Sequence, residues 1–270
     1  MILSSLVFAY LDCGIRSLDV DITDTDSVSL TKRLVGAQEA VRGEFPWQVR
    51  LRSFGQLTYS GVLIRPNWVL TAASCFNDNY NPSLWTAVLN DLSSTSVDPG
   101  EKVIYVDSIF IYGGFKRGDS QNNLALVKLE TSSTSDTKIL KGVDIFKLMP
   151  LQFIVTQRSF VFGAAYSTSL RKVKVKLFDA KECSRLGIAP SVGLDQMCVT
   201  SADSTQNEFN QEGPCTGDRG SPVLCKTGDR WAVVGVVSDE YACQSPRSTA
   251  PLIVNVEYFY SWINKIISQF

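Results

Sequence analysis

The sequence contains no histidine among its 270 residues. Imidazole is the most frequent general base in enzymes and the commonest metal ligand in proteins, so its absence removes both roles at once. Long apolar runs are also missing: no stretch of 18 apolar residues occurs. The formal net charge is -1, which creates no global field to attract nucleic acid or an anionic membrane. We therefore expect no metal, no cofactor, no nucleic-acid partner and no membrane span.

The seven cysteines favour disulfides over a metal site. None of them forms a C-x-x-C pair, and no histidine is present to complete a zinc site. An odd number leaves at least one thiol outside any set of intramolecular pairs. The cysteines are Cys13, Cys75, Cys183, Cys198, Cys215, Cys225 and Cys243.

The first 33 residues differ in composition from the rest of the chain. Residues 1–11 are apolar, and the small residues Val7 and Ala9 fit a signal-peptidase rule, although no basic residue precedes the run. We interpret residues 1–11 as a signal peptide, and a buried N-terminal strand is the alternative. Residues 12–33 form a spacer with five aspartates, which predicts an exposed, flexible segment. This spacer ends at Lys32-Arg33, a dibasic pair that a trypsin-like enzyme can cut.

The long body reads as β structure with one helix. Short β-branched and aromatic runs recur between Gly, Pro, Asn and Asp clusters, a cadence that favours an antiparallel sandwich or barrel. At the C-terminus, apolar residues from Phe259 to Phe270 recur at helical spacing and predict an amphipathic helix. The predicted strands cover 47–51, 59–64, 68–71, 102–112, 124–129, 171–177 and 231–237.

Four blocks of the body, in chain order, resemble blocks of the trypsin- and chymotrypsin-like serine proteases. Arg33–Ala37 with Glu44–Val49 resembles their activation site and first strand. Trp68–Cys75 resembles the block that normally ends Ala-Ala-His-Cys, Asn122–Leu129 the block usually read Asn-Asp-Ile-Ala-Leu, and Cys215–Pro222 the nucleophile block Cys-x-Gly-Asp-Ser-Gly-Gly-Pro. The resemblance implies an all-β fold, a trypsin-like double six-stranded antiparallel β-barrel with a C-terminal α-helix. It places the protease domain at 34–270, with barrels at about 34–150 and 151–270.

The resemblance also locates the three positions of the catalytic triad. A triad needs a nucleophile, a base and an orienting carboxylate. The base position is Ser74, the orienting position is Asn123, and the nucleophile position is Arg219. A serine hydroxyl is a poor proton acceptor, an amide is neutral, and a guanidinium has no nucleophilic lone pair. The sequence therefore predicts a protease frame without its chemistry, and a catalytic site with no working residue.

The specificity pocket is altered in the same alignment. Gly213 stands where trypsin has the aspartate that selects basic side chains, and Pro251 stands where a glycine keeps the pocket open. The pocket wall, usually Ser-Trp-Gly, aligns with Ser238-Asp239-Glu240. Arg219 either pairs with Asp239 or Glu240 and plugs the pocket, or the two carboxylates are simply solvated.

One regulatory device is retained in the resemblance. In these proteases, cleavage frees an amine that folds inward and pairs with the aspartate before the nucleophile. The matching parts are Arg33 as the cleavage residue, Leu34 as the new N-terminus and Asp218 as the partner. The alternative is an inherited vestige that is never cut.

The resemblance also assigns the cysteines. Cys75 and Cys225 lack their usual partners and are expected to be buried thiols. Cys13 resembles the propeptide cysteine of chymotrypsinogen without its partner, so it is either an exposed thiol or a link to another chain. The implied disulfides are Cys183–Cys198 and Cys215–Cys243.

Between residues 171 and 177, lysines alternate with apolar residues. This period of two predicts a strand with one core face and one basic face that carries Lys172, Lys174 and Lys176. The basic face is either solvated or a docking patch for an acidic partner.

We hypothesise a secreted, extracellular, non-catalytic serine-protease homologue. Its expected role is binding or regulation, as a cofactor, decoy or adaptor whose partner is a protease, a protease substrate or an inhibitor. The competing hypotheses are a hydrolase that activates Ser221 without histidine, and a drifted paralogue without function.

Overall fold

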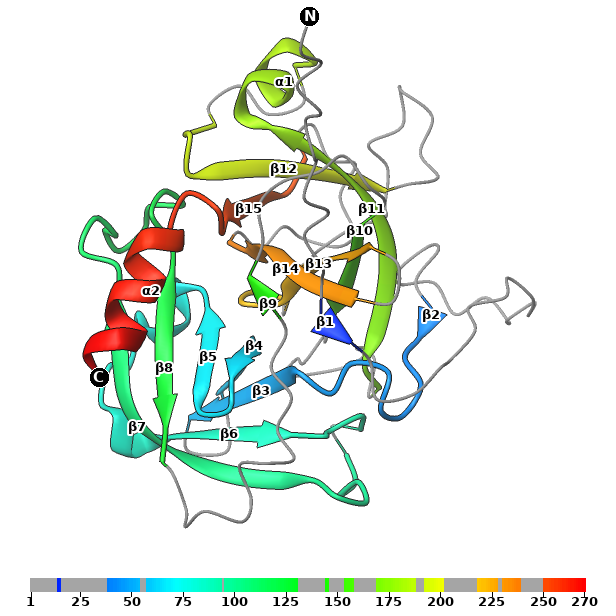
Figure 1. Cartoon of the computed structure of the whole chain (residues 1–270), viewed down its shortest axis with the longest axis vertical. Coiled ribbons are helices and arrows are strands. Elements are labelled where there is room, and N and C mark those ends of the chain that lie inside the picture. Colours follow the sequence, from blue (N-terminus) through cyan, green and yellow to red (C-terminus); the bar gives the residue numbers. More distant parts are fainter. Residues whose placement is uncertain are drawn as a thin grey trace, which may run out of the picture.

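The computed structural model contains two β-barrels that follow one another along the chain (Figure 1). The structure describes residues 14–15, 38–53, 57–93, 95–130, 144–145, 153–157, 169–187, 192–201, 218–227, 230–238 and 250–270. The first barrel closes in the order β3-β4-β5-β8-β7-β6, with every neighbouring pair antiparallel. Its strands are β3 (Gln48–Ser53), β4 (Leu57–Arg65), β5 (Trp68–Thr71), β6 (Trp85–Leu89), β7 (Lys102–Ile111) and β8 (Ala125–Leu129).

Six strands of the second half form another ring of antiparallel pairs. The sheet runs β14-β13-β10-β11-β12-β15, and β14 also pairs with β15, which joins the two ends. The predicted all-β double-barrel class is therefore confirmed. The strands are β10 (Phe153–Gln157), β11 (Arg171–Asp179), β12 (Gln196–Ser201), β13 (Pro222–Thr227), β14 (Arg230–Val237) and β15 (Leu252–Asn255).

One edge of β14 is covered by three separate pieces of chain. β13 takes the opposite edge along its length, so β1 (Gly14–Ile15), β9 (Asp144–Ile145) and β15 share the remaining one. They pair in succession with residues 230–231, 232–233 and 235–237 of β14. Covering an edge in this way blocks pairing with another chain. Gly14 and Ile15 belong to the spacer of residues 12–33 that was predicted to be flexible, yet their backbones pair with the edge of β14.

The seven predicted strands all match observed ones, with ends that differ by at most two residues. The agreement follows from burial, because alternate or successive apolar residues of these runs fill one core that extends through both barrels. The largest fully buried side chains are Trp47, Trp85, Trp231, Phe259, Leu51, Leu63, Ile64, Leu70, Leu89, Leu124 and Leu126.

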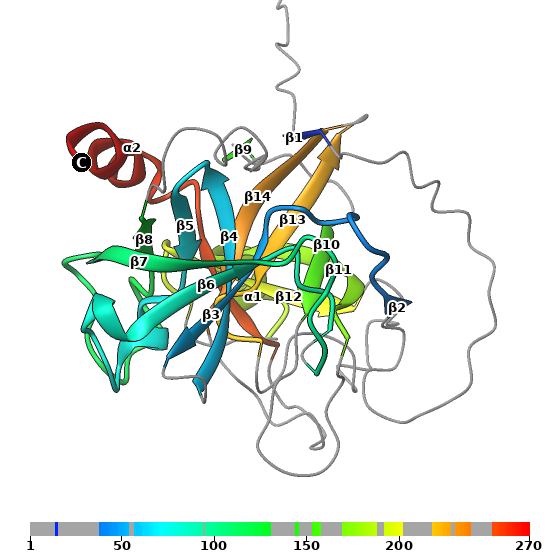
Figure 2. The ribbon, with the colours of Figure 1, turned by 90° about the horizontal axis from the view of Figure 1, so that it is seen from below.

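The predicted C-terminal helix is α2 (Tyr260–Gln269), and it returns from the second barrel to the first (Figures 1 and 2). The ring of Tyr112, just after β7, contacts Phe259 and Trp262 with centroids 4.8 and 5.5 Å away. Lys128 of β8 donates to the main-chain oxygen of Phe270 at 2.7 Å. Among the described residues, no helix has the length and the apolar character needed to cross a membrane.

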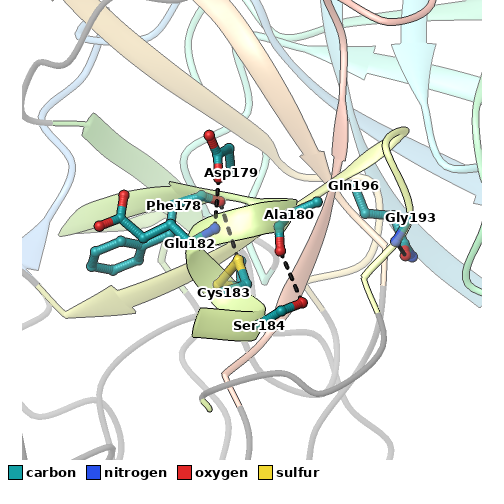
Figure 3. Close-up of a disulfide and its surroundings, with 9 residues drawn as sticks. Phe178, Asp179, Ala180, Glu182, Cys183, Ser184, Gly193 and Gln196 are labelled. Atoms are coloured by element: carbon teal, nitrogen blue, oxygen red, sulfur yellow. Dashed lines mark hydrogen bonds between the residues drawn. A yellow bond between two sulfur atoms is a disulfide. The ribbon is translucent and has the colours of Figure 1, made fainter. Parts of the chain in front are cut away.

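A second helix, α1 (Ala180–Arg185), was not predicted from the sequence. Asp179 caps it by accepting from the backbone amide of Glu182 at 2.7 Å, a signal that its Asp-x-x-Glu spacing could have provided. The helix holds Cys183, which forms the predicted disulfide with Cys198 of β12 (Figure 3). This disulfide ties α1 to the second barrel.

The predicted basic face of β11 is not uniformly exposed. Lys172 is buried, and its ammonium lies 2.6 Å from the carboxylate of Glu44, whose side chain is fully buried. Glu44 also accepts from the backbone amide of Val41 at 2.9 Å. Lys176 is exposed as predicted. The interpretation of three equivalent surface lysines is therefore wrong, because an internal carboxylate draws Lys172 inward.

The same region holds the segment that precedes the first barrel. β2 (Gln38–Glu39) pairs with Arg171 and Lys172 of β11, and the backbone amide of Ala40 donates to Leu170 at 2.8 Å. The chain is thus fixed to the second barrel before it enters β3 of the first.

Candidate functional site

The three predicted triad positions meet at the boundary between the barrels. Ser74 lies in the 3-10 turn η1 (Ala73–Phe76) after β5, Asn123 lies just before β8, and Arg219 lies in the turn before β13. The Nδ2 of Asn123 lies 2.9 Å from the Ser74 hydroxyl, and the Nη1 of Arg219 lies 3.5 Å from the Ser74 carbonyl oxygen. Residues that are 145 positions apart in the chain are therefore neighbours here.

The side chain of Asn123 is the centre of this group. Its Oδ1 accepts from the backbone amide of Ser74 at 2.8 Å. Its Nδ2 donates to the hydroxyl of Ser74 at 2.9 Å, and to the hydroxyl and the carbonyl oxygen of Ser238 at 2.9 and 3.2 Å. Asn123 is 1% exposed, so these bonds replace water completely. An amide suits the position because it both accepts and donates.

The turn at Asp218–Ser221 is held from both sides. The carbonyl oxygen of Arg219 accepts from the amide of Ser60 in the first barrel at 3.1 Å, and the amide of Gly220 donates to Val237 in the second at 2.9 Å. Gly220 has a φ of +82°, and a Cβ there would overlap the Ser60 carbonyl oxygen and the Thr71 hydroxyl. Only glycine fits such a position without strain. The turn aims the guanidinium at Ser74.

The chemistry available at this site follows from the groups that meet there. Ser74 and Ser238 offer hydroxyls, Asn123 offers a neutral amide, and Arg219 offers a guanidinium group that donates hydrogen bonds but does not accept them. Hydroxyls and amides exchange hydrogen bonds but do not take up a proton usefully at neutral pH. Ser221, the nucleophile of the alternative hypothesis, is fully buried.

The sequence model of the trypsin family matches residues 34–263, which include both barrels and the first residues of α2. The chain belongs to the trypsin family. The match begins at the residue where the sequence alignment placed the activation cleavage, between Arg33 and Leu34. The matched range contains Ser74, Asn123 and Arg219.

Several predicted residues of this trypsin-family domain are placed, and others lie outside the described residues. Ser238 follows β14 and bonds to Asn123, whereas buried Pro251 precedes β15 and accepts from the amide of Val199 at 3.1 Å. Asp218 is fully buried. The predicted residues outside the described ranges are Arg33, Leu34, Gly213, Asp239 and Glu240.

The cysteines divide in the same way. Cys75 and Cys225 are buried thiols, as predicted from their missing partners. The predicted pair Cys215–Cys243 and the question of Cys13 lie outside the described residues.

The sequence did not predict the polar residues that bond to the neighbours of the triad positions. Ser120 accepts through its carbonyl oxygen from the Ser238 hydroxyl at 3.1 Å and from the Gln196 amide at 2.9 Å. The backbone amide of Asn122 donates to the carboxylate of Asp195. Isolated polar residues in loops give no periodic signal, so only the three-dimensional arrangement brings them together.

Three carboxylates of the first barrel also cluster, at Asp91, Asp98 and Glu101. Their ligand oxygens lie within 4.8 Å of one another. Asp91 pairs with Arg50, and Asp98 pairs with Arg42 and accepts from two backbone amides. These contacts use the acids as partners for arginines and for their own loop, so the cluster has a structural explanation.

Proposed function

We propose that this chain is a secreted, catalytically inactive member of the trypsin family that acts as a binding or regulatory protein in an extracellular proteolytic pathway. Its role would be that of a cofactor, a decoy or an adaptor for a protease, a protease substrate or an inhibitor. The observation that carries the proposal is the meeting of Ser74, Asn123 and Arg219, where the family holds its base, its orienting acid and its nucleophile.

The hydrogen bonds of this site support the proposal further. Asn123 is saturated by Ser74 and Ser238, and Arg219 extends toward the carbonyl of Ser74 across the space between the nucleophile and base positions. No histidine exists anywhere in the chain to replace the base. A remaining oxyanion hole without a nucleophile or base gives little acceleration. The burial of Ser221 argues against a second route that uses this serine.

Active-site labelling tests the loss of catalysis. A fluorophosphonate reacts with an activated serine, so we expect no labelling of the chain before or after cleavage at Arg33, while active trypsin is labelled in parallel. Labelling that disappears in Ser221→Ala would establish the alternative enzyme and refute the proposal.

The regulatory role is tested with proteins rather than with probes. Purified chain, cut or uncut, is added to an active trypsin-like protease together with its protein substrate or its protein inhibitor. A cofactor or adaptor increases the rate of substrate cleavage, and a decoy protects the protease from the inhibitor. If the chain changes neither the rate of substrate cleavage nor the inhibition of the protease, this result favours a drifted paralogue without function.

We also propose that cleavage after Arg33 orders the pocket loops. β2 fixes residue 38 on β11, which leaves only residues 34–37 between the cut and the fixed chain. When extended, these four residues span about 14 Å, so the new N-terminus at Leu34 stays within this distance of the fixed residue 38. Asp218 is a fully buried carboxylate, the group that a buried ammonium stabilises in return.

Hydrogen exchange tests this switch with an engineered cleavage site in place of Lys32-Arg33. We expect slower exchange after the cut in the peptides that contain the pocket positions Gly213, Asp239 and Glu240, and no slowing when Asp218→Asn is cut in the same way. Equal exchange before and after the cut would mean that the site is a vestige.

A further inference from the structure

Residues Ser120–Asn123 belong to the first barrel, yet much of their hydrogen bonding is to the second. The carbonyl oxygen and the hydroxyl of Ser120 accept from the Nε2 of Gln196 at 2.9 and 3.1 Å. The Ser120 carbonyl also accepts from the Ser238 hydroxyl at 3.1 Å. The amide of Asn122 donates to Asp195, and the Nδ2 of Asn123 donates to Ser238.

The partners on the second barrel are themselves fixed. The carbonyl oxygen of Asp195 accepts from the amide of Asn255, the last residue of β15, at 2.8 Å, and its side chain is almost fully buried. Gln196 opens β12 opposite Val254 of β15. Ser238 follows β14, and its amide donates to Leu252 of β15 at 3.2 Å. The groups of Asp195, Gln196 and Ser238 that bond to Ser120–Asn123 are therefore held in place by the second barrel.

The backbone of the segment is shaped for this contact. Asn122 has a φ of 55°, a left-handed conformation that asparagine adopts more readily than most residues. This turn lets the amide of Asn122 face Asp195 while the side chain of Asn123 enters the boundary between Ser74 and Ser238.

We propose that Ser120–Asn123 is a clasp that holds the two barrels together, and that the clasp depends on the amide of Asn123. The amide joins an acceptor contact in the first barrel, with the backbone N–H of Ser74, to donor contacts in the second, with the hydroxyl and carbonyl of Ser238. Aspartate keeps the first contact but places an oxygen against the Ser238 carbonyl, which only accepts. The asparagine thus has a role of its own at a triad position.

A double-mutant cycle between Asn123 and Ser238 tests the clasp. Asn123→Ala, Asn123→Asp and Ser238→Ala are each expected to lower Tm by about 3–8 °C, since each removes buried hydrogen bonds. In Asn123→Ala/Ser238→Ala the losses should not add, with a coupling of about tenfold or more in the unfolding equilibrium. Asn264→Ala is the matched control, because that amide bonds only within α2 in the described structure, to the Tyr260 carbonyl at 3.1 Å.

Hydrogen exchange separates a clasp from general stabilisation. In Asn123→Ala, the amides of Asn122 and Ser74 should exchange at least tenfold faster than in the parent, while that of Val69 in β5 keeps its protection. Additive losses in the cycle, or an equal rise in exchange at Asn122 and Val69, would overturn the proposal. Should Asn123→Ala fail to fold, Ser238→Ala with the same exchange measurement decides the question.

Discussion

Among the contacts that join the two barrels, one is mainly aromatic and another is mainly polar. In the aromatic contact, the rings of Phe45 and Trp47, at the start of the first barrel, meet Trp231 of β14 with centroids 5.8 and 6.3 Å away. The neighbouring residue Glu44 adds the buried pair with Lys172. In the polar contact, the clasp at Ser120–Asn123 and the turn at Asp218–Ser221 exchange hydrogen bonds with the opposite barrel.

The difference teaches where substitutions can accumulate. Aromatic packing depends on area and tolerates small shifts, whereas each buried polar group needs a partner in the right place. The three positions that align with the family's reacting groups stand on the polar side, where each buried group needs a donor or an acceptor. Serine at 74 and asparagine at 123 meet this need for each other, so this buried polar site is well bonded with these two residues.

The largest effect is expected on the polar side, at Gly220. Gly220→Ala introduces a Cβ that overlaps the Ser60 carbonyl oxygen and the Thr71 hydroxyl at a φ of +82°. We expect a loss of about 4 kcal/mol or more in the free energy of unfolding, or no folded protein. Urea unfolding measures it. Gly113→Ala is the control, because nothing lies within 4 Å of a Cβ there, and a loss at Gly220 no larger than at Gly113 would contradict the packing of the turn.

The next effect tests the ion pair on the aromatic side. Lys172→Met leaves the carboxylate of Glu44 in the core without this ammonium, which should cost about 3–5 kcal/mol. Lys176→Met on the exposed part of the same strand should change stability by less than about 0.5 kcal/mol. Equal effects at the two lysines, measured by urea unfolding, would show that β11 has a uniform basic face after all.

The sequence predicted the barrel class because strands such as Trp68–Thr71 are short apolar runs with turn residues at their ends. Family motifs predicted Ser74, Asn123 and Arg219 as the triad positions, and the structure brings these three residues together. The disulfide Cys183–Cys198 was implied by the resemblance to the same family.

The sequence could not supply contacts that depend on distant partners. Lys172 and Lys176 look alike at a period of two, and only the position of Glu44 separates them. Ser120 looks like any loop serine until Gln196 and Ser238 approach it. The pairing of Gly14 and Ile15 with β14 required knowledge of which strand edge was open.

A third prediction concerns activity on the polar side. Restoring Ser74→His, Asn123→Asp and Arg219→Ser together should give little cleavage after Lys or Arg, because Gly213 offers no charge to a basic side chain and Pro251 stands where the family keeps a glycine. The triple mutant is first cleaved after residue 33. Its activity is then measured as the rate of hydrolysis of Lys and Arg peptide substrates, with active trypsin as the reference. Robust tryptic activity would show that the pocket is open and that only the triad was lost.

The smallest effect distinguishes bonded from unbonded hydroxyls within the polar contact. The Ser221 hydroxyl is fully buried and has no hydrogen-bond partner in the described part of the chain, whereas the Ser238 hydroxyl bonds to Ser120 and Asn123. A buried hydroxyl without a partner costs free energy, so Ser221→Ala should leave stability unchanged or raise it by up to about 1 kcal/mol. Ser238→Ala, measured in the same urea titration, should lower it. If Ser221→Ala instead costs as much as Ser238→Ala, the Ser221 hydroxyl is bonded in solution, and the polar contact extends deeper into the second barrel than the clasp and the turn.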